Sequence, residues 1–216
     1  KKIYDSFTSI SYDLNGPYIY CTLQYQPEKT TCPLGNEFDN QLLMVEKISK
    51  HLPKGWKLYV KEHPSQFAST YARNGENYRS KNFYEKLNSI SNVVLIPLTS
   101  NNFEMIDNAM AVASVTSTSC WEAVLRNKPS IVFGHCWFRY CEGVFYINSD
   151  KKLDNFMKNV LPTYRVDSNK VKLFTKILLD HSFPGIIGGQ RLRKYYNISD
   201  KENAESHYKA IRDLIS

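Results

Sequence analysis

Residues 109–123 read Ala-Met-Ala-Val-Ala-Ser-Val-Thr-Ser-Thr-Ser-Cys-Trp-Glu-Ala. The first seven, 109–115, form a short and largely apolar run of the kind that becomes a buried strand. Four consecutive hydroxyl residues end that run at 116–119, and a helix-forming segment begins at once. The stretch therefore predicts a strand that feeds directly into a helix N-terminus, which is a basic connection of α/β sheets.

The four hydroxyl residues at this junction have two interpretations. The first-turn N–H groups of a helix lack intrahelical acceptors and carry partial positive charge, so they bind phosphate, and neighbouring hydroxyls add donors. Alternatively, Ser117 or Thr118 simply caps the helix, because one hydroxyl is enough for a cap. Four hydroxyls in a row exceed what capping needs. Both interpretations remain open at this point.

The composition is that of an ordinary globular chain. Of 216 residues, 42% are hydrophobic and 23% are charged, and no apolar run approaches the roughly 20 residues of a membrane span. The net charge of +7 suits a polyanionic substrate, an anionic nucleotide or an anionic membrane surface. Because the basic residues form no dense patch and no known reader motif, we expect no nucleic-acid partner.

The cysteines indicate the compartment. There are five, which is an odd number, and none forms a CxxC pair. Reduced thiols in a cytoplasmic protein are the simplest account, with peripheral association at the inner face of the membrane as an open alternative. His135, Cys136 and Cys141 lie close in sequence, but their spacing fits no common zinc pattern, so we expect no metal site.

Strand and helix patterns alternate along the chain. The expected strands are 18–23, 57–61, 93–96, 109–115, 130–133 and a β-rich piece at 144–147. The expected helices are 38–52, 82–90, 102–108, 119–126, 153–160, 171–181 and 200–215. A polar loop is expected at 65–79 and a Gly-rich break at 184–189. This order predicts an α/β fold: a Rossmann-like parallel sheet with helices on both faces and a helical C-terminal tail.

The same pattern suggests how the chain is divided. Residues 1–16 are polar and irregular, as in a linker or the tail of a preceding domain. Residues 17–150 hold the expected nucleotide-binding sheet. Residues 151–216 hold the last helices, which we expect to pack on the same domain.

The chemically distinctive segments follow the ends of these strands. They are 24–31 after the first strand, 61–64 after the second, 116–119 after the fourth and 134–138 after the fifth. In a parallel sheet the carboxyl ends of the strands lie along one edge, where ligands bind. We therefore expect all four segments to line one site.

His63 is the most distinctive residue of the second segment. A histidine at a strand end is more often a surface residue than a functional one. Here Pro64 fixes the backbone directly after it, and Lys61 precedes it by two residues on the same face. A rigidly held imidazole can donate a hydrogen bond to a phosphate oxygen.

Two further positions have competing interpretations. Glu122 lies one turn inside the predicted helix, where it accepts hydrogen bonds from ribose hydroxyls or simply faces solvent. Trp137 and Phe138 either stack on a nucleotide base or fill the core. The residues alone do not separate these alternatives.

Several of these segments resemble a known family. Three of them occur in the same order in the capsule polysaccharide synthesis family. They are Lys-Glu-His-Pro at 61–64, Thr-Ser-Cys-Trp-Glu-Ala at 118–123 and Lys-Pro-Ser-Ile-Val-Phe-Gly at 128–134. The segment 23–31 is also similar to that family's loop after the first strand. The family includes bacterial glycosyltransferases of GT-B fold, among them β-Kdo transferases that use CMP-Kdo. The resemblance covers roughly residues 18–147.

The resemblance implies a donor-binding half of a GT-B enzyme. In related enzymes that use CMP-sugars, such as bacterial sialyltransferases, the matching His and hydroxyls hold the donor phosphate, which makes His63 the expected catalytic residue. With the rim segments included, the expected donor-binding residues are Gln26, Glu28, Lys61, His63, Pro64, Thr116, Ser117, Thr118, Ser119, Glu122, Gly134 and Trp137.

The resemblance also implies the partners. They are a nucleotide-sugar donor, a growing saccharide or glycolipid acceptor, and the N-terminal GT-B domain, which this chain lacks and which usually supplies the general base. No cofactor is expected.

Two other functions remain open. One is a CDP-glycerol-type phosphotransferase of wall polymer synthesis, whose helix-start motif tends to place an acidic residue before paired serines. Residues 115–119 read Val-Thr-Ser-Thr-Ser and contain no acidic residue. The other is a non-catalytic module that binds nucleotide-sugars through the same rim.

Overall fold

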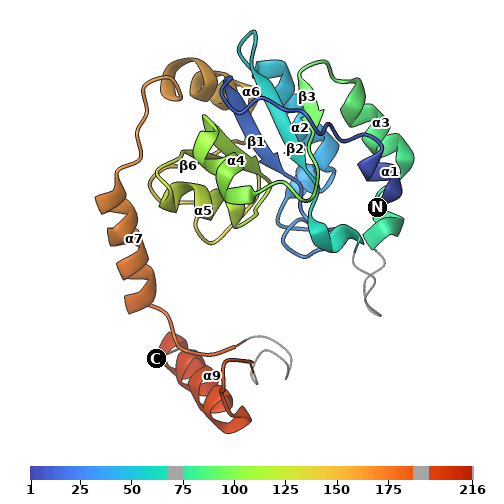
Figure 1. Ribbon diagram of the computed structural model, residues 1–216. Helices are drawn as coiled ribbons and strands as arrows, with labels where there is room; N and C mark the ends of the chain where they lie inside the picture. The colour runs from blue at the N-terminus through green and yellow to red at the C-terminus, as the bar shows by residue number, and fades with distance from the viewer. Residues whose placement is uncertain (68–74, 187–194, 216) are drawn as a thin grey trace. The chain divides into compact units, whose positions relative to one another are not determined.

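The computed structural model describes residues 1–67, 75–186 and 195–215 (Figure 1). Parts of the expected loop at 65–79 and of the expected break at 184–189 therefore lie outside the described residues. Contacts between residues divide the chain into two compact units, Lys1–Val171 and Lys172–Ser216.

The first unit is built on a parallel sheet. In the described part of the chain the sheet has six strands in the order β3-β2-β1-β4-β5-β6, and every neighbouring pair is parallel. The strands are β1 Tyr18–Thr22, β2 Lys57–Lys61, β3 Val93–Leu95, β4 Ala111–Ser114, β5 Ser130–Val132 and β6 Val144–Tyr146. The predicted Rossmann-like parallel sheet is confirmed.

Helices connect the strands. They are α1 Lys2–Asp5, α2 Gln41–His51, α3 Lys81–Ser89, α4 Asn102–Asn108, α5 Ser119–Leu125, α6 Asp150–Asn155, α7 Ser168–Asp180 and α9 Asp200–Ile215. Short 3-10 helices lie at η1 Asn36–Asp39, η2 Pro64–Phe67 and η3 Gly75–Tyr78, and α6 continues into the π-helix η4 Phe156–Val160. Among these helices none is both long and apolar enough to span a bilayer.

Alternation along the central strand β1 shows how the helices cover both faces of the sheet. Ile19 and Cys21 face the main hydrophobic core, which also contains buried residues of α2, α3 and α6. Tyr18 and Tyr20 face the opposite side, where the Tyr18 hydroxyl donates to the carbonyl of Met105 in α4 at 2.7 Å. Figure 1 shows α4 and α5 on one side of the sheet and α2 on the other.

The N-terminal segment 1–16, expected as a linker or the tail of a preceding domain, contributes to this core. Tyr4 of α1 is fully buried, and its hydroxyl donates to the carbonyl of Ile96 at 2.5 Å. The polar and irregular sequence gave no sign of this packing, in which the partly buried Phe7 also takes part.

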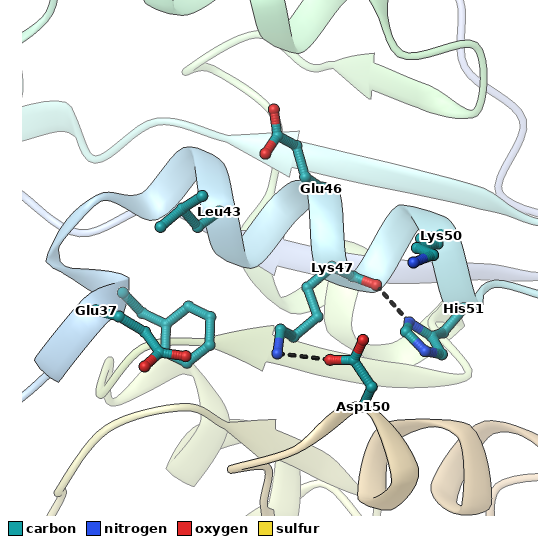
Figure 2. Close-up of a pocket in the computed structure, with 8 residues that line it drawn as sticks. Glu37, Leu43, Glu46, Lys47, Lys50, His51 and Asp150 are labelled. Carbon is teal, nitrogen blue, oxygen red and sulfur yellow. Dashed lines mark hydrogen bonds and ion pairs between the residues drawn. The ribbon is translucent and has the colours of Figure 1, made fainter.

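The segment that follows β6 also packs on the sheet unit. Leu153 of α6 and Phe156 and Met157 of η4 belong to the same core. An ion pair between Lys47 of α2 and Asp150 of α6, 2.7 Å apart, joins the two helices at the surface (Figure 2). For residues 172–216, packing on the same domain stays a prediction.

The second unit contains most of α7 and all of α9. Within it the Asn203 side chain accepts the N–H of Ile186 at 2.7 Å and donates to the carbonyl of the same residue at 3.2 Å.

Candidate functional site

A pocket of about 240 Å³ lies at the carboxyl ends of β1 and β2, facing the first turn of α5. The strand register creates this convergence, because Thr22 at the end of β1 pairs with Lys61 at the end of β2. Of the residues expected from sequence, the pocket brings together Lys61, His63, Pro64, Ser117, Thr118, Ser119 and Glu122. It adds Tyr20, Thr22, Leu23, Glu62 and Asn102.

His63 lies on the exposed side of the pocket and has a defined orientation. Its ring Nδ1 lies 3.1 Å from the backbone N–H of Ser65, which can only donate. Nδ1 therefore accepts, and the neutral ring carries its proton on Nε2. The backbone N–H of His63 is held in turn by the Glu62 carboxylate at 3.0 Å. The pocket thus holds an imidazole whose Nε2–H can donate a hydrogen bond to a ligand.

Lys61 is a buried residue of the pocket lining. It is only 5% exposed, and its ammonium donates to the carbonyl of Ser100 at 2.6 Å and to Oδ1 of Asn102 at 2.7 Å. Burial lowers the pKa of Lys61 because the charged form loses hydration. The Tyr20 hydroxyl donates to the same Asn102 oxygen at 3.0 Å, which fixes the start of α4 against β1.

The hydroxyl residues form a chain across the pocket. The Oγ atoms of Thr22 and Ser119 lie 2.6 Å apart, and Ser119 donates to Ser117 at 3.1 Å. The cap position of α5 is Thr118, whose side chain makes no capping hydrogen bond. Ser117 accepts the N–H of Ser119 at 3.3 Å, so one hydroxyl helps to satisfy the helix start. Capping therefore accounts for only part of the hydroxyl run.

Glu122 also lines this pocket, from one turn inside α5. Partial burial raises the pKa of its carboxyl group, because the charged form is poorly hydrated there. Its position is compatible with the predicted contact to a ribose hydroxyl.

Other residues expected from sequence do not line the pocket, and two of them are occupied within the fold. The Thr116 hydroxyl donates to the carbonyl of Thr30 at 2.6 Å, and its backbone N–H donates to Oε1 of Gln24 at 2.7 Å. Gln26 is buried and donates to the Thr31 hydroxyl at 2.6 Å. Thr116 thus holds the loop after β1 against the end of β4, and Gln26 braces that loop internally.

Glu28, Gly134 and Trp137 also lie outside the pocket lining. The Glu28 carbonyl accepts the backbone N–H of Thr31 at 3.1 Å, in the turn after β1. Gly134 is buried where a side chain would collide with neighbouring atoms. Trp137 is 52% exposed and packs 5.0 Å from the ring of Trp121, whereas the neighbouring Phe138 is fully buried in the core.

Glu62 is the most important residue that sequence reasoning missed. Its carboxylate is fully buried beneath His63 and accepts from Arg79 Nε at 2.8 Å and from the Tyr84 hydroxyl at 3.0 Å. The position of Glu62 beside His63 was a sign of its role in the sequence. Its partners Arg79 and Tyr84, however, lie elsewhere in the chain, so the sequence did not reveal them. Asn102 gave a weaker signal, as a polar residue at a predicted helix start.

A second pocket, of about 330 Å³, lies between α2 and the start of α6 and contains none of the expected site residues. Figure 2 shows Lys47 and Asp150 paired across it, with the His51 ring on the carbonyl of Lys47. Within the described ranges, no group of three or more His, Cys, Asp or Glu side chains is arranged to hold a metal ion.

Comparison with solved structures identifies similar folds. A UDP-GlcNAc 2-epimerase from Methanocaldococcus jannaschii is 16% identical with a TM-score of 0.52, over 83% of this chain and 49% of that one. KpsC of Thermosulfurimonas dismutans, a β-Kdo 2,7 transferase, is 13% identical with a TM-score of 0.46, over 80% and 58%. A UDP-GlcNAc 2-epimerase from Neisseria meningitidis bound to UDP-GlcNAc is 16% identical with a TM-score of 0.45, over 83% and 47%.

At these identities the likeness concerns the fold, and the chain spans about half the length of the structures it resembles. No curated protein matches it in sequence.

The family comparison covers most of the chain. Residues 8–183 match the family described as capsule polysaccharide biosynthesis protein. This range includes every residue of the pocket at the ends of β1 and β2. The resemblance inferred from the Lys-Glu-His-Pro and hydroxyl motifs is confirmed, and the chain belongs to the capsule polysaccharide biosynthesis family.

Proposed function

We propose that the pocket at the ends of β1 and β2, here called the donor pocket, binds the phosphate of a nucleotide-activated sugar. The protein would then act as the donor-binding part of a glycosyltransferase in capsule polysaccharide synthesis. The Lys-Glu-His-Pro and hydroxyl motifs resemble those of β-Kdo transferases, so we propose CMP-Kdo as the donor. The acceptor is a growing surface polysaccharide or glycolipid.

One observation carries this proposal. Lys61 and His63 line the same pocket as Ser117, Thr118 and Ser119, although the two groups are more than 50 residues apart in the chain. Phosphate oxygens accept strong hydrogen bonds from a cation, from an imidazole N–H and from hydroxyl groups. These groups converge at the carboxyl edge of a parallel sheet, and that edge is where such ligands bind.

The chemistry would be displacement of the nucleotide from the anomeric carbon of the sugar. As that bond breaks, negative charge grows on the departing phosphate. The Nε2–H of His63 would donate to this charge, and the ammonium of Lys61, with two of its three protons on Ser100 and Asn102, would donate its third. A second domain would supply the general base that activates the acceptor.

Glu122 would then select the nucleotide part of the donor. Its carboxylate lies on the same pocket and would accept from a ribose hydroxyl. The Glu122→Gln variant should therefore weaken CMP binding without weakening the binding of inorganic phosphate, because the change removes a negative charge from the pocket.

The test is calorimetric titration of the protein with CMP, CDP, UDP and GDP, repeated on His63→Ala. We expect a preference for CMP and a loss of about tenfold or more in affinity in the variant, because a hydrogen bond to a charged group is removed. The matched control is His51→Ala, which removes an imidazole from the pocket of Figure 2 instead. The control should bind CMP as the unaltered protein does.

Other outcomes identify the alternatives. A preference for CDP would favour a CDP-glycerol-type phosphotransferase. Binding of CMP without sugar transfer, even when the second domain is present, would favour a non-catalytic nucleotide-sugar module. Equal binding by His63→Ala and the unaltered protein would contradict the proposed site.

A further inference from the structure

A cavity of about 620 Å³ opens beside the edge strand β6 and the helix pair α6–η4. It shares no lining residue with the donor pocket. All three residues of β6 are half-buried, so this end of the sheet is less covered than the central strands. We call it the β6 cavity.

Two cations lie near one ring of its lining, that of Tyr146, and of the two Lys152 itself lines the cavity. The guanidinium carbon of Arg139 lies 5.0 Å from the centroid of the Tyr146 ring, and the ammonium of Lys152 lies 5.9 Å from the same centroid. Among the residues that the structure describes, neither cation forms an ion pair with a carboxylate. A bound anion would supply the counter-charge that both cations lack among the described residues.

His135 belongs to the same cluster. Its ring lies 5.8 Å from the ring of Tyr146, and its Nδ1 is in contact with the guanidinium of Arg139. A guanidinium only donates, so Nδ1 accepts and the neutral His135 ring carries its proton on Nε2. His135 therefore presents another hydrogen-bond donor next to Arg139 and Tyr146.

The wall of the cavity is aromatic. Phe145 and Phe156 lie 4.8 Å apart between ring centroids, and Tyr146 continues the surface to the rim. Ser149 and Asn155 add polar groups at the edge. Apolar faces bordered by hydrogen-bonding groups match a pyranose ring, which has C–H faces and hydroxyl edges. The volume falls within the range of small-molecule sites.

We propose that the β6 cavity binds an acidic saccharide, with its carboxylates on Arg139 and Lys152 and its ring faces on the aromatic wall. The inference rests on the proposed function, in which the saccharide is the acceptor chain. The cavity lies in the same unit as the donor pocket, so a chain held there would be retained between successive transfers. Carboxylates are the best partners of an Arg and a Lys together, which is why a neutral glycan fits less well.

The experiment measures binding of an oligosaccharide of galacturonic acid, with a maltooligosaccharide of the same length as the neutral probe. The variants Lys152→Gln and Arg139→Gln each remove one cation. Lys158→Gln is the matched control, because Lys158 is exposed in η4, pairs with Asp154 and does not line the cavity. We expect the acidic probe to bind, to lose about tenfold in affinity in each of the two variants, and to weaken with added salt.

Several results would overturn the proposal. They are no binding of the acidic probe, equal binding by the neutral probe, or the same loss in Lys158→Gln. Tighter binding of a single-stranded oligonucleotide would assign the surface to nucleic acid instead. Self-association that Lys152→Gln abolishes would assign it to a second copy of the chain.

Nucleotide titration of the same variants separates this inference from the proposed function. Lys152→Gln should bind CMP normally, because Lys152 lies outside the donor pocket. If the acidic probe binds as expected but no nucleotide does, the donor-site proposal fails and the saccharide site stands. If nucleotide binds and the acidic probe does not, only the saccharide site fails.

Discussion

Glu62 links the two halves of the donor pocket at the scale of single residues. Its buried carboxylate holds the backbone N–H of His63, and Arg79 bridges that carboxylate to the carbonyl of Gln24 at 3.0 Å. The end of β2 and the loop after β1 are thus fixed through one ion pair. A buried carboxylate is tolerated only when it is paired and hydrogen-bonded, and here both conditions hold.

The first prediction concerns this ion pair. Arg79→Met leaves the Glu62 carboxylate buried without its cation and should lower the free energy of unfolding by about 3 kcal/mol or more. Urea denaturation measures the change. The control is Lys81→Met, which removes an exposed cation paired with Glu85 and should cost about 0.5 kcal/mol or less. Similar losses in the two variants would show that the buried pair is not needed.

A second prediction follows from the buried ammonium of Lys61. Burial lowers its pKa below the ordinary 10.5, so the folded protein binds fewer protons there than the unfolded chain does. This contribution to stability therefore increases as the pH rises from the lowered pKa towards 10.5. We therefore compare the free energy of unfolding of the unaltered protein with that of Lys61→Met. The first minus the second should increase as the pH approaches 10.5 from below.

Urea denaturation at several pH values tests this dependence. The other ionisable groups are present in both proteins, so their effects cancel to first order in the difference. A difference that stays constant or falls with pH would contradict the assignment to Lys61.

At the scale of elements, the loops after β1, β4 and β5 fit closely together. A Cβ atom on Gly134 would lie 2.6 Å from Cγ2 of Thr116 and 2.7 Å from the carbonyl oxygen of Leu34. Gly134 therefore permits contact between the loop after β5 and the loop after β1. Its role is close packing, and it does not line the donor pocket.

The third prediction uses this contact. Gly134→Ala should destabilise the protein by about 1–3 kcal/mol, because the backbone of Leu34 cannot move aside as a flexible side chain would. Thermal unfolding measures the loss. The control is Gly16→Ala, whose Cβ would meet only one atom, 3.4 Å away. A melting temperature equal to that of the control would show that the loops adjust without cost.

The elements themselves were largely predictable from the sequence. Short apolar runs bounded by polar residues located every strand, because strands buried on both faces carry a strong local signal. The roles of the loop residues were not predictable in the same way. Thr116 and Gln26 carry side chains typical of ligand-binding residues. Thr116 nevertheless bonds to the loop after β1, and Gln26 bonds within that loop, which only the three-dimensional contacts reveal. Glu62 and Arg79 were missed for the same reason.

At the scale of the whole molecule, the residues of the donor pocket come from four separate segments of a single unit. Parallel topology places those segments along one edge, which is why strand order and motif position together predicted much of the pocket. The family match covers this unit from residue 8 onward and continues to residue 183. The proposed donor pocket therefore lies entirely within the part of the chain that matches the capsule polysaccharide biosynthesis family.

The most direct test of this account is nuclear magnetic resonance of the histidine rings during titration with CMP. The chain has five histidines, and His63 lies on the donor pocket, His51 on the pocket of Figure 2 and His135 beside the β6 cavity. We predict that CMP shifts the Nε2 signal of His63 and leaves those of His51 and His135 in place. A shift at His51 or His135 with His63 unchanged, or no shift at saturating CMP, would contradict the account.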